Sequence, residues 1–245
     1  MDAVVNGIRV NYVMEGQGET VLLLHGWGSS LEPYRALMDQ LKEKYRVVAL
    51  DFPGFGGSDE PDGPWDVDGF VDFTLAFIET LQVKKLSLVG HSFGGRVIIK
   101  MANRELPFEI SKITLIGSAG IKPPKSNKKS FRQTVFKVGK WFLSRKPVAK
   151  LWPEALEKLR VKFGSADYAA ASPLMRQCLV KAINEDLTHL LPGITARPAS
   201  GMDFSISLPS ARGVAVSFSP QINSVGALIP GSRWVRSSLM AFTRH

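Results

Sequence analysis

The chain has 245 residues, a formal net charge of +9 and one cysteine, Cys178. This length suits a single domain with an insertion, because a domain of this size buries roughly three quarters of its unfolded surface without cross-links. One cysteine excludes an internal disulfide and is typical of a reducing compartment. The first residues lack a signal-peptide pattern, and no apolar run approaches the roughly 18 residues of a membrane span, so we expect a cytoplasmic protein.

The first 120 residues alternate short apolar runs with helical patterns. An apolar run bounded by turn residues predicts a strand, and apolar residues three or four positions apart predict an amphipathic helix. Asn6-Gly7 divides the first run, which is typical of a type I′ hairpin turn. This alternation predicts an α/β fold with a mostly parallel sheet. The expected strands are residues 4–13, 21–24, 46–50, 85–89 and 113–116, and the expected helices are residues 31–45, 67–83 and 95–101.

From residue 121 the chain becomes polar and basic. Helical patterns follow at residues 131–143, 148–163 and 173–191, and no strand pattern interrupts them. We interpret this stretch as a helical domain inserted after the sixth strand. Its basic face has two interpretations, namely a solvated helix surface or contact with an anionic membrane surface or an acidic substrate. No recognition motif accompanies the charge, so we expect no nucleic-acid partner.

The most informative motif is Gly-x-Ser-x-Gly, formed by Gly90, Ser92 and Gly94. An apolar strand pattern at residues 86–89 precedes it, and a helical pattern at residues 95–101 follows it. A serine on a sharp turn between a strand and a helix is typical of a nucleophile elbow, in which small residues must flank the serine. The helix N-terminus also favours negative charge that develops beside the serine. We therefore predict that Ser92 is a catalytic nucleophile.

A second motif, His25-Gly26-Trp27-Gly28, follows the apolar run at residues 21–24. Acyl transfer through a serine needs backbone N–H groups that bind the oxyanion. In the elbow architecture, one N–H comes from the residue after the nucleophile and one from the loop after the third strand. This architecture predicts the N–H groups of Phe93 and Trp27 as the oxyanion hole.

Two histidines lie near these motifs. His25 is open to interpretation as a catalytic base, but bracing the loop that carries Gly26 and Trp27 is the role we favour. His91 lies inside the elbow, and we expect its side chain to point away from that of Ser92. Neither histidine is therefore our candidate for the base.

Three motifs in this order resemble the α/β-hydrolase fold family, in its esterase-like group with a helical cap. They are the segments 25–28, 51–58 (Asp-Phe-Pro-Gly-Phe-Gly-Gly-Ser) and 90–95, and the resemblance covers residues 3–195. It implies a serine hydrolase that cleaves a carboxylic ester or a similar acyl bond of a small molecule. The implied domains are a core at residues 1–120, a helical cap over the nucleophile at residues 121–191 and an atypical segment at residues 192–245.

We expect neither a metal nor a cofactor. No group of His, Cys, Asp or Glu has the spacing of metal ligands in the sequence. The glycine-rich segment 54–57 lacks the dinucleotide-binding fingerprint.

The resemblance ends where the other catalytic residues are due. The family places an acid after a seventh strand, here due near Ile194, and a histidine after an eighth strand. From residue 196 the chain is instead rich in Ser, Gly, Pro and Arg, and a shifted reading frame is one hypothesis for this change. Asp203 is the only acid after Asp186, and His245 is the only histidine of this tail. We keep Asp203 as the candidate acid and His245 as the candidate base.

The same departure affects the sheet. Weak strand patterns occur at residues 204–208 and 213–218, but we expect the last two family strands to be missing or altered. The sixth strand would then be an exposed, apolar edge of the sheet.

Two functional hypotheses remain. The first is a serine hydrolase that acts through Ser92, with carbon–carbon bond hydrolysis and perhydrolysis as related serine chemistries. The second is a catalytically impaired, truncated or frame-shifted member that acts at most as a binding scaffold. Turnover that depends on Ser92 separates the two hypotheses. The sequence predicts no oligomeric state.

Overall fold

The chain forms one nine-stranded sheet in a computed structural model that describes residues 1–118, 166–195, 203–207, 216–218 and 226–227. The strand order is β1-β2-β4-β3-β5-β6-β7-β8-β9, and the strands from β4 to β7 in this order run parallel. The strands are β1 (Asp2–Val5), β2 (Ile8–Glu15), β3 (Thr20–Leu24), β4 (Arg46–Leu50), β5 (Lys85–His91), β6 (Glu109–Ile116), β7 (Asp203–Ser207), β8 (Val216–Phe218) and β9 (Gly226–Ala227).

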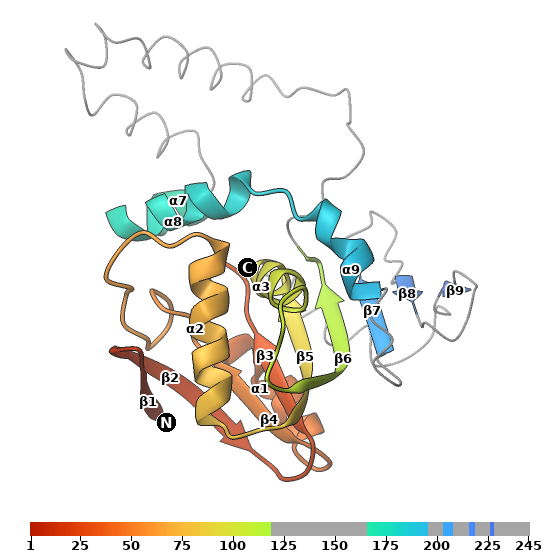
Figure 1. Cartoon of the computed structure of the whole chain (residues 1–245). Helices are drawn as coiled ribbons and strands as arrows, with labels where there is room; N and C mark the ends of the chain where they lie inside the picture. The colour runs from red at the N-terminus through yellow and green to blue at the C-terminus, as the bar shows by residue number, and fades with distance from the viewer. Residues whose placement is uncertain (119–165, 196–202, 208–215, 219–225, 228–245) are drawn as a thin grey trace, which may run out of the picture.

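Helices cover both faces of the sheet, with α2 and α3 on one face and α1 on the other (Figure 1). Two further helices, α7 and α8, cross the edge where the parallel strands end. None of the described helices is long and apolar enough to span a bilayer. The described helices are η1 (Glu32–Tyr34), α1 (Arg35–Leu41), α2 (Val67–Thr80), α3 (Phe93–Met101), α7 (Ala166–Ala170), α8 (Pro173–Asn184), η2 (Thr188–Leu190) and α9 (Leu191–Thr195).

The central strand β3 is buried on both faces, as its continuous apolar sequence predicts. Successive side chains of a strand point to opposite faces of the sheet. Leu22 and Leu24 therefore pack with residues of α2 and α3, whereas Val21 and Leu23 pack with residues of α1. Two apolar cores result, and together they fix the position of the loop that follows Leu24.

The predicted hairpin between β1 and β2 is confirmed. Asn6 has φ 51° and Gly7 has φ 82°. Positive φ at both central residues defines a type I′ turn, whose twist matches that of the two strands. The predicted strands of residues 21–24, 46–50, 85–89 and 113–116 all lie within observed strands.

Three predicted helices are shorter than expected. The helix expected at residues 67–83 ends at Thr80. The helix expected at residues 31–45 begins as the 3-10 turn η1 and ends at Leu41. The helix expected at residues 173–191 ends at Asn184, because Glu185 takes an extended conformation with φ −77° and ψ 131°. The helices expected at residues 131–143 and 148–163 lie outside the described residues.

The expectation that the sixth strand is an exposed edge is wrong. β7 pairs in parallel with β6, from Lys112 opposite Asp203 to Ile116 opposite Ser207. β8 and β9 then extend the sheet in antiparallel pairs, with Phe204 opposite Phe218. β7 and β8 coincide with the weak strand patterns of the tail. β6 is therefore paired with β5 on one side and, from Lys112 to Ile116, with β7 on the other.

We expect Phe70→Ala to lower the free energy of unfolding by about 3–5 kcal/mol, because truncating a buried phenylalanine leaves a cavity. The Phe70 ring is fully buried on α2 and makes edge-to-face contacts with Trp27, Phe52, Trp65 and Phe93. Urea unfolding followed by circular dichroism measures the loss.

The matched control is Ile183→Ala, which truncates a side chain that is 60% exposed. It should change the stability by less than about 0.5 kcal/mol. Equal losses in the two variants would contradict the burial of Phe70.

Candidate functional site

Ser92 occupies the sharp turn between β5 and α3. It is the N-cap residue of α3 and has φ 48° and ψ −105°. This conformation is rare for a residue with a side chain and costs about 1–3 kcal/mol, so the surrounding structure must hold it. The Ser92 N–H donates to the carbonyl of Ile116 at the end of β6 (3.0 Å), which fixes the turn from one side.

Glycines permit the close approach that creates this turn. A Cβ at Gly94 would collide with the carbonyl oxygen of Leu24, and the Gly94 N–H donates to His25 O (3.0 Å). A Cβ at Gly90 would lie 2.8 Å from the carbonyl carbon of Gly94, closer than real Cβ atoms come. The first turn of α3 is therefore bonded directly to the end of β3.

The two residues predicted to donate to the oxyanion, Trp27 and Phe93, lie side by side in the fold. The rings of Trp27 and Phe93 lie 5.0 Å apart and nearly perpendicular. Among the described residues, neither backbone N–H donates to another protein group. Phe93 opens α3, so its N–H also lies at the positive end of the helix dipole. Neither N–H group is therefore used by the part of the fold that the structure describes.

His25 has both ring nitrogens in hydrogen bonds. Nδ1 lies 2.7 Å from Gly26 O, and the Phe52 N–H donates to Nε2 (2.9 Å). These partners assign the neutral tautomer with the proton on Nδ1. Burial lowers the pKa of His25 to about 4. The side chain joins the loop after β3 to the loop after β4, and it has no free nitrogen for Ser92.

Asp51 has a similar bracing position. Its carboxylate accepts hydrogen bonds from Leu31 N (2.6 Å), Asn11 Nδ2 (2.7 Å) and Gly57 N (2.9 Å). A buried carboxylate needs such donors to offset its desolvation. Asp51 therefore holds three chain segments together around the loop after β4.

His91 lies beside Gly26 in the loop after β3. A Cβ at Gly26 would be 2.9 Å from His91 Nδ1 and 3.3 Å from Ser92 Cβ. Burial lowers the pKa of His91, so its ring is neutral near pH 7. A side chain at position 26 would therefore displace the His91 ring and crowd Ser92.

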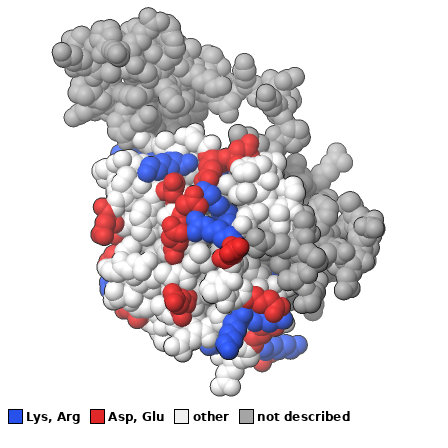
Figure 2. All heavy atoms as spheres, in the orientation of Figure 1, with Lys and Arg blue, Asp and Glu red and all other residues white. Residues whose placement is uncertain are grey.

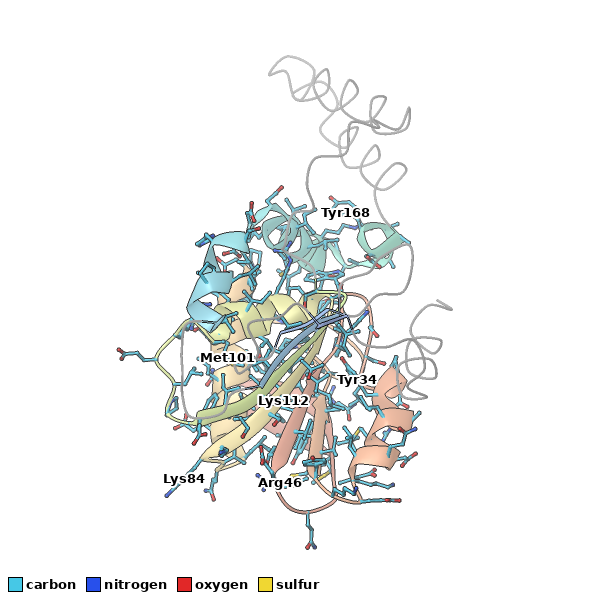
Figure 3. The ribbon with its side chains drawn as sticks, turned by 90° about the vertical axis from the view of Figure 1, so that its right-hand side faces the viewer. Tyr34, Arg46, Lys84, Met101, Lys112 and Tyr168 are labelled. Atoms are coloured by element: carbon cyan, nitrogen blue, oxygen red, sulfur yellow. The ribbon has the colours of Figure 1, made fainter. Side chains whose placement is uncertain are left out.

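The helices α7 and α8, which we call the roof, close over the carboxyl ends of the strands. Figure 3 shows Tyr168 of α7 at this edge of the sheet. Met175 of α8 occupies the space where a Cβ of Gly54 would lie, in the loop after β4. Asp167 Oδ1 would lie 3.2 Å from a Cβ at Gly28, in the loop after β3. The roof therefore touches both loops that surround Ser92.

The register of β7 does not bring Asp203 to Ser92. His91 pairs with Ile116, and Ile116 pairs with Ser207, so Ser207 lies level with the elbow. Asp203 starts the strand opposite Lys112, four residues earlier. At about 3.3 Å per residue this is roughly 13 Å below the elbow, and Figure 3 shows Lys112 well away from the roof. The backbone of Asp203 therefore lies several residues from the level of Ser92, and its role as the catalytic acid stays a prediction.

The remaining site predictions concern other groups. His245 lies outside the described residues. In the part of the chain that the structure describes, no group of three His, Cys, Asp or Glu residues has the arrangement of a metal site.

Comparison with known proteins agrees with this geometry. A family model described as the alpha/beta hydrolase fold matches residues 19–156, which is more than half of the chain. The chain belongs to the alpha/beta hydrolase fold family. It is 33% identical over 127 residues to the 2-hydroxymuconate semialdehyde hydrolase of Pseudomonas sp. (strain CF600), a match that covers 50% of this chain and 44% of that protein. The chain thus spans less than half the length of this curated relative.

Solved structures show the same fold. The esterase EaEST from Exiguobacterium antarcticum superposes with a TM-score of 0.57 at 24% identity, over 79% of this chain and 76% of that chain. A membrane phospholipase A, described as a bacterial virulence factor, superposes with a TM-score of 0.50 at 27% identity, over 79% of this chain and 60% of that chain.

Some contacts of this alpha/beta hydrolase fold protein are missed by reasoning from the sequence. Met175 and Asp167 touch the loops around Ser92 from helices more than 70 residues further along the chain. Neither residue lies in a motif. Only the apolar pattern of residues 173–184 indicates that Met175 faces the core.

We expect Ser92→Gly to be more stable than Ser92→Ala by about 1 kcal/mol, because glycine adopts positive φ without strain and alanine does not. Urea unfolding of the two variants measures the difference. The matched pair is Ser87→Gly and Ser87→Ala in β5, where a glycine weakens the strand. The strained turn is refuted should glycine be the less stable residue at both positions.

We expect stability to fall as the pH decreases from about 7 to 4. The pKa of His25 is about 4 in the folded protein and 6.5 in the reference state, so the unfolded chain binds more protons between these values. The neutral ring stabilises the fold fully above the unfolded pKa, and up to about 3 kcal/mol is lost on approaching the folded pKa. Denaturant unfolding at pH 4.5, 5.5 and 7.5 measures this slope.

The slope should be smaller in His25→Gln than in the wild type, because the glutamine side chain does not titrate. A wild-type slope that persists in His25→Gln would assign it to other groups.

Proposed function

We propose that this alpha/beta hydrolase fold protein is a serine hydrolase of carboxylic esters or similar acyl compounds, with Ser92 as nucleophile. The observation that carries the proposal is the strained conformation of Ser92 at the N-terminus of α3. The N–H groups of Trp27 and Phe93, which have no partner among the described residues, support it. Strain of this kind persists only where the structure imposes it, and it clusters at active sites.

The chemistry uses these groups in two steps. Ser92 Oγ attacks the acyl carbon as its proton passes to a base, and the N–H groups of Trp27 and Phe93 bind the oxyanion. The tetrahedral intermediate collapses, the alcohol leaves with a proton, and Ser92 carries the acyl group. Water then attacks the acyl-enzyme, which releases the acid and returns the proton to Ser92.

The base in this proposal is His245. His25 uses both nitrogens in the loop braces, and His189 lies exposed on η2. His91 packs beside Gly26 in the core of the elbow. His245 is the remaining histidine of the sequence.

The alternative function is a binding protein without turnover. The register of β7 supports it, because the backbone of Asp203 pairs opposite Lys112, whereas Ser207 is the residue level with the elbow. A serine without an oriented base loses about 10⁴ to 10⁶ in turnover, although the oxyanion hole still binds acyl compounds.

We also propose that the substrate is presented at an anionic surface. Residues 122–162 contain thirteen Lys and Arg but two acidic residues, together with aromatic residues such as Phe136 and Trp141. Basic and aromatic side chains together favour contact with anionic lipid headgroups. The similarity to a membrane phospholipase A supports a lipid-like ester.

Hydrolysis of p-nitrophenyl butyrate should depend on Ser92. We expect Ser92→Ala to lower turnover by about 10⁴-fold or more, because the nucleophile is lost. Ser87→Ala is the control, since Ser87 lies on β5 and bonds to Glu19 at the surface. Release of p-nitrophenolate measures the rates.

A fluorophosphonate probe adds an independent readout, because it labels an activated serine covalently. We expect labelling of the wild type and of Ser87→Ala, and none of Ser92→Ala. Labelling lost in His245→Ala would assign the base. Equal rates in wild type and Ser92→Ala, with no labelling, would favour the binding protein.

A further inference from the structure

Arg96 is a buried cation on the helix that begins at Ser92. Its residue is 6% exposed, although arginines are rarely buried without a partner. Nη1 donates to the backbone oxygen of Glu185 (2.9 Å), which is the residue that ends α8. Burial lowers the pKa of Arg96, and the nearby carboxylates of Glu185 and Asp186 oppose this shift. The guanidinium thus joins the nucleophile helix to the end of the roof.

A second contact reinforces the same junction. Lys100, one turn further along α3, pairs with the carboxylates of Glu185 and Asp68. Arg104 pairs with Asp68 and Asp72 on α2. Figure 2 shows basic and acidic side chains side by side on the face of the molecule where α2 and α3 lie in Figure 1. Glu185 therefore connects the end of α8 to the network of ion pairs between α2 and α3.

The other end of α8 rests on the loops around Ser92. Met175 fills the space beside Gly54, in the loop after β4. Phe55, which follows Gly54 in this loop, packs against the Trp27 ring at a centroid distance of 5.0 Å. Between the two ends, Cys178 and Ala182 are buried against the core. α8 is a twelve-residue helix, so its two ends move together. Fixing the end at Glu185 therefore also fixes the height of Met175 above the loops.

We propose that Arg96 is a positioning residue that sets the height of α8 over Ser92 through Glu185, and so determines how well large acyl groups bind. This inference rests on the proposed function, because it assigns a specificity role at the same site. Arg96 does not touch the reacting atoms. It acts through α8, which lies over the loops after β3 and β4. In this proposal, a long acyl chain that extends beyond the oxyanion hole contacts this face of α8.

This role predicts a separation between binding and chemistry. We call the contact between Arg96 and Glu185 the clamp. A short acyl group reacts at Ser92 without reaching α8, so loss of the clamp does not change the turnover of a short ester. A long acyl group contacts α8 in both the ground state and the transition state, so loss of the clamp raises KM and leaves kcat nearly unchanged. A merely destabilised protein would instead lose activity on both substrates alike.

The test compares Arg96→Met, Arg96→Lys and Glu185→Gln with the control Arg46→Met. Arg46 lies at the opposite edge of the sheet from Tyr168 (Figure 3) and bonds to Thr20. We expect Arg96→Met to raise KM for p-nitrophenyl octanoate about tenfold and to change kcat for p-nitrophenyl acetate by less than about twofold. Arg96→Lys keeps a donor and should recover part of the loss. Glu185→Gln keeps the backbone acceptor and should show a smaller increase in KM.

Hydrogen–deuterium exchange without substrate tests the clamp separately from turnover. We expect residues 173–184 to exchange several-fold faster in Arg96→Met, with β3 unchanged and with no effect of Arg46→Met. Unchanged exchange in residues 173–184, or an equal change of kcat for both esters, overturns the proposal. A wild type without Ser92-dependent turnover refutes the proposed function, whereas the exchange result still decides whether Arg96 holds α8.

Discussion

The close contact between α3 and the end of β3 constrains the whole carboxyl edge of the sheet. Gly94 leaves no room for a side chain against Leu24 O, and that same carbonyl accepts the Tyr34 hydroxyl (3.0 Å) from the opposite face. Because the first turn of α3 lies directly against the end of β3, only Ser92 separates β5 from α3, and the chain must turn at this one residue. Ser92 takes this turn at positive φ, and its backbone strain is balanced by the packing on both sides.

The buried polar side chains near this edge hold the loops after β3 and β4 in position. His25 and Asp51 are both buried. His25 bonds to the backbone groups Gly26 O and Phe52 N–H, whereas Asp51 accepts hydrogen bonds from two backbone N–H groups and from Asn11. An unsatisfied buried polar group costs about 1–3 kcal/mol, so these partners stabilise one arrangement of the two loops. The loop after β3 is therefore held before any ligand arrives, which is what an oxyanion hole requires.

Local patterns predicted the local features. Asn6-Gly7 specified its hairpin, and the strand–Ser92–helix order specified the elbow, because each depends on neighbours in sequence. The end of α8 at Glu185 was predicted wrongly, and the register of Asp203 was not predicted at all. Glu185 has an extended backbone and contacts Arg96 and Lys100, which lie more than 80 residues away, and no periodicity records such a contact. Register between parallel strands likewise depends on partners that a single sequence does not reveal.

The position of Cys178 makes its thiol a probe of whether α8 is packed against the core. The thiol lies buried on the face of α8 that meets the core, and burial raises its pKa. Alkylating reagents react with the exposed thiolate, so they reach Cys178 only in molecules whose α8 has separated from the core. Since the chain has one cysteine, each modified molecule records a single opening event. The alkylation rate of the native protein therefore gives the free energy of lifting α8 as long as closing is faster than the chemistry.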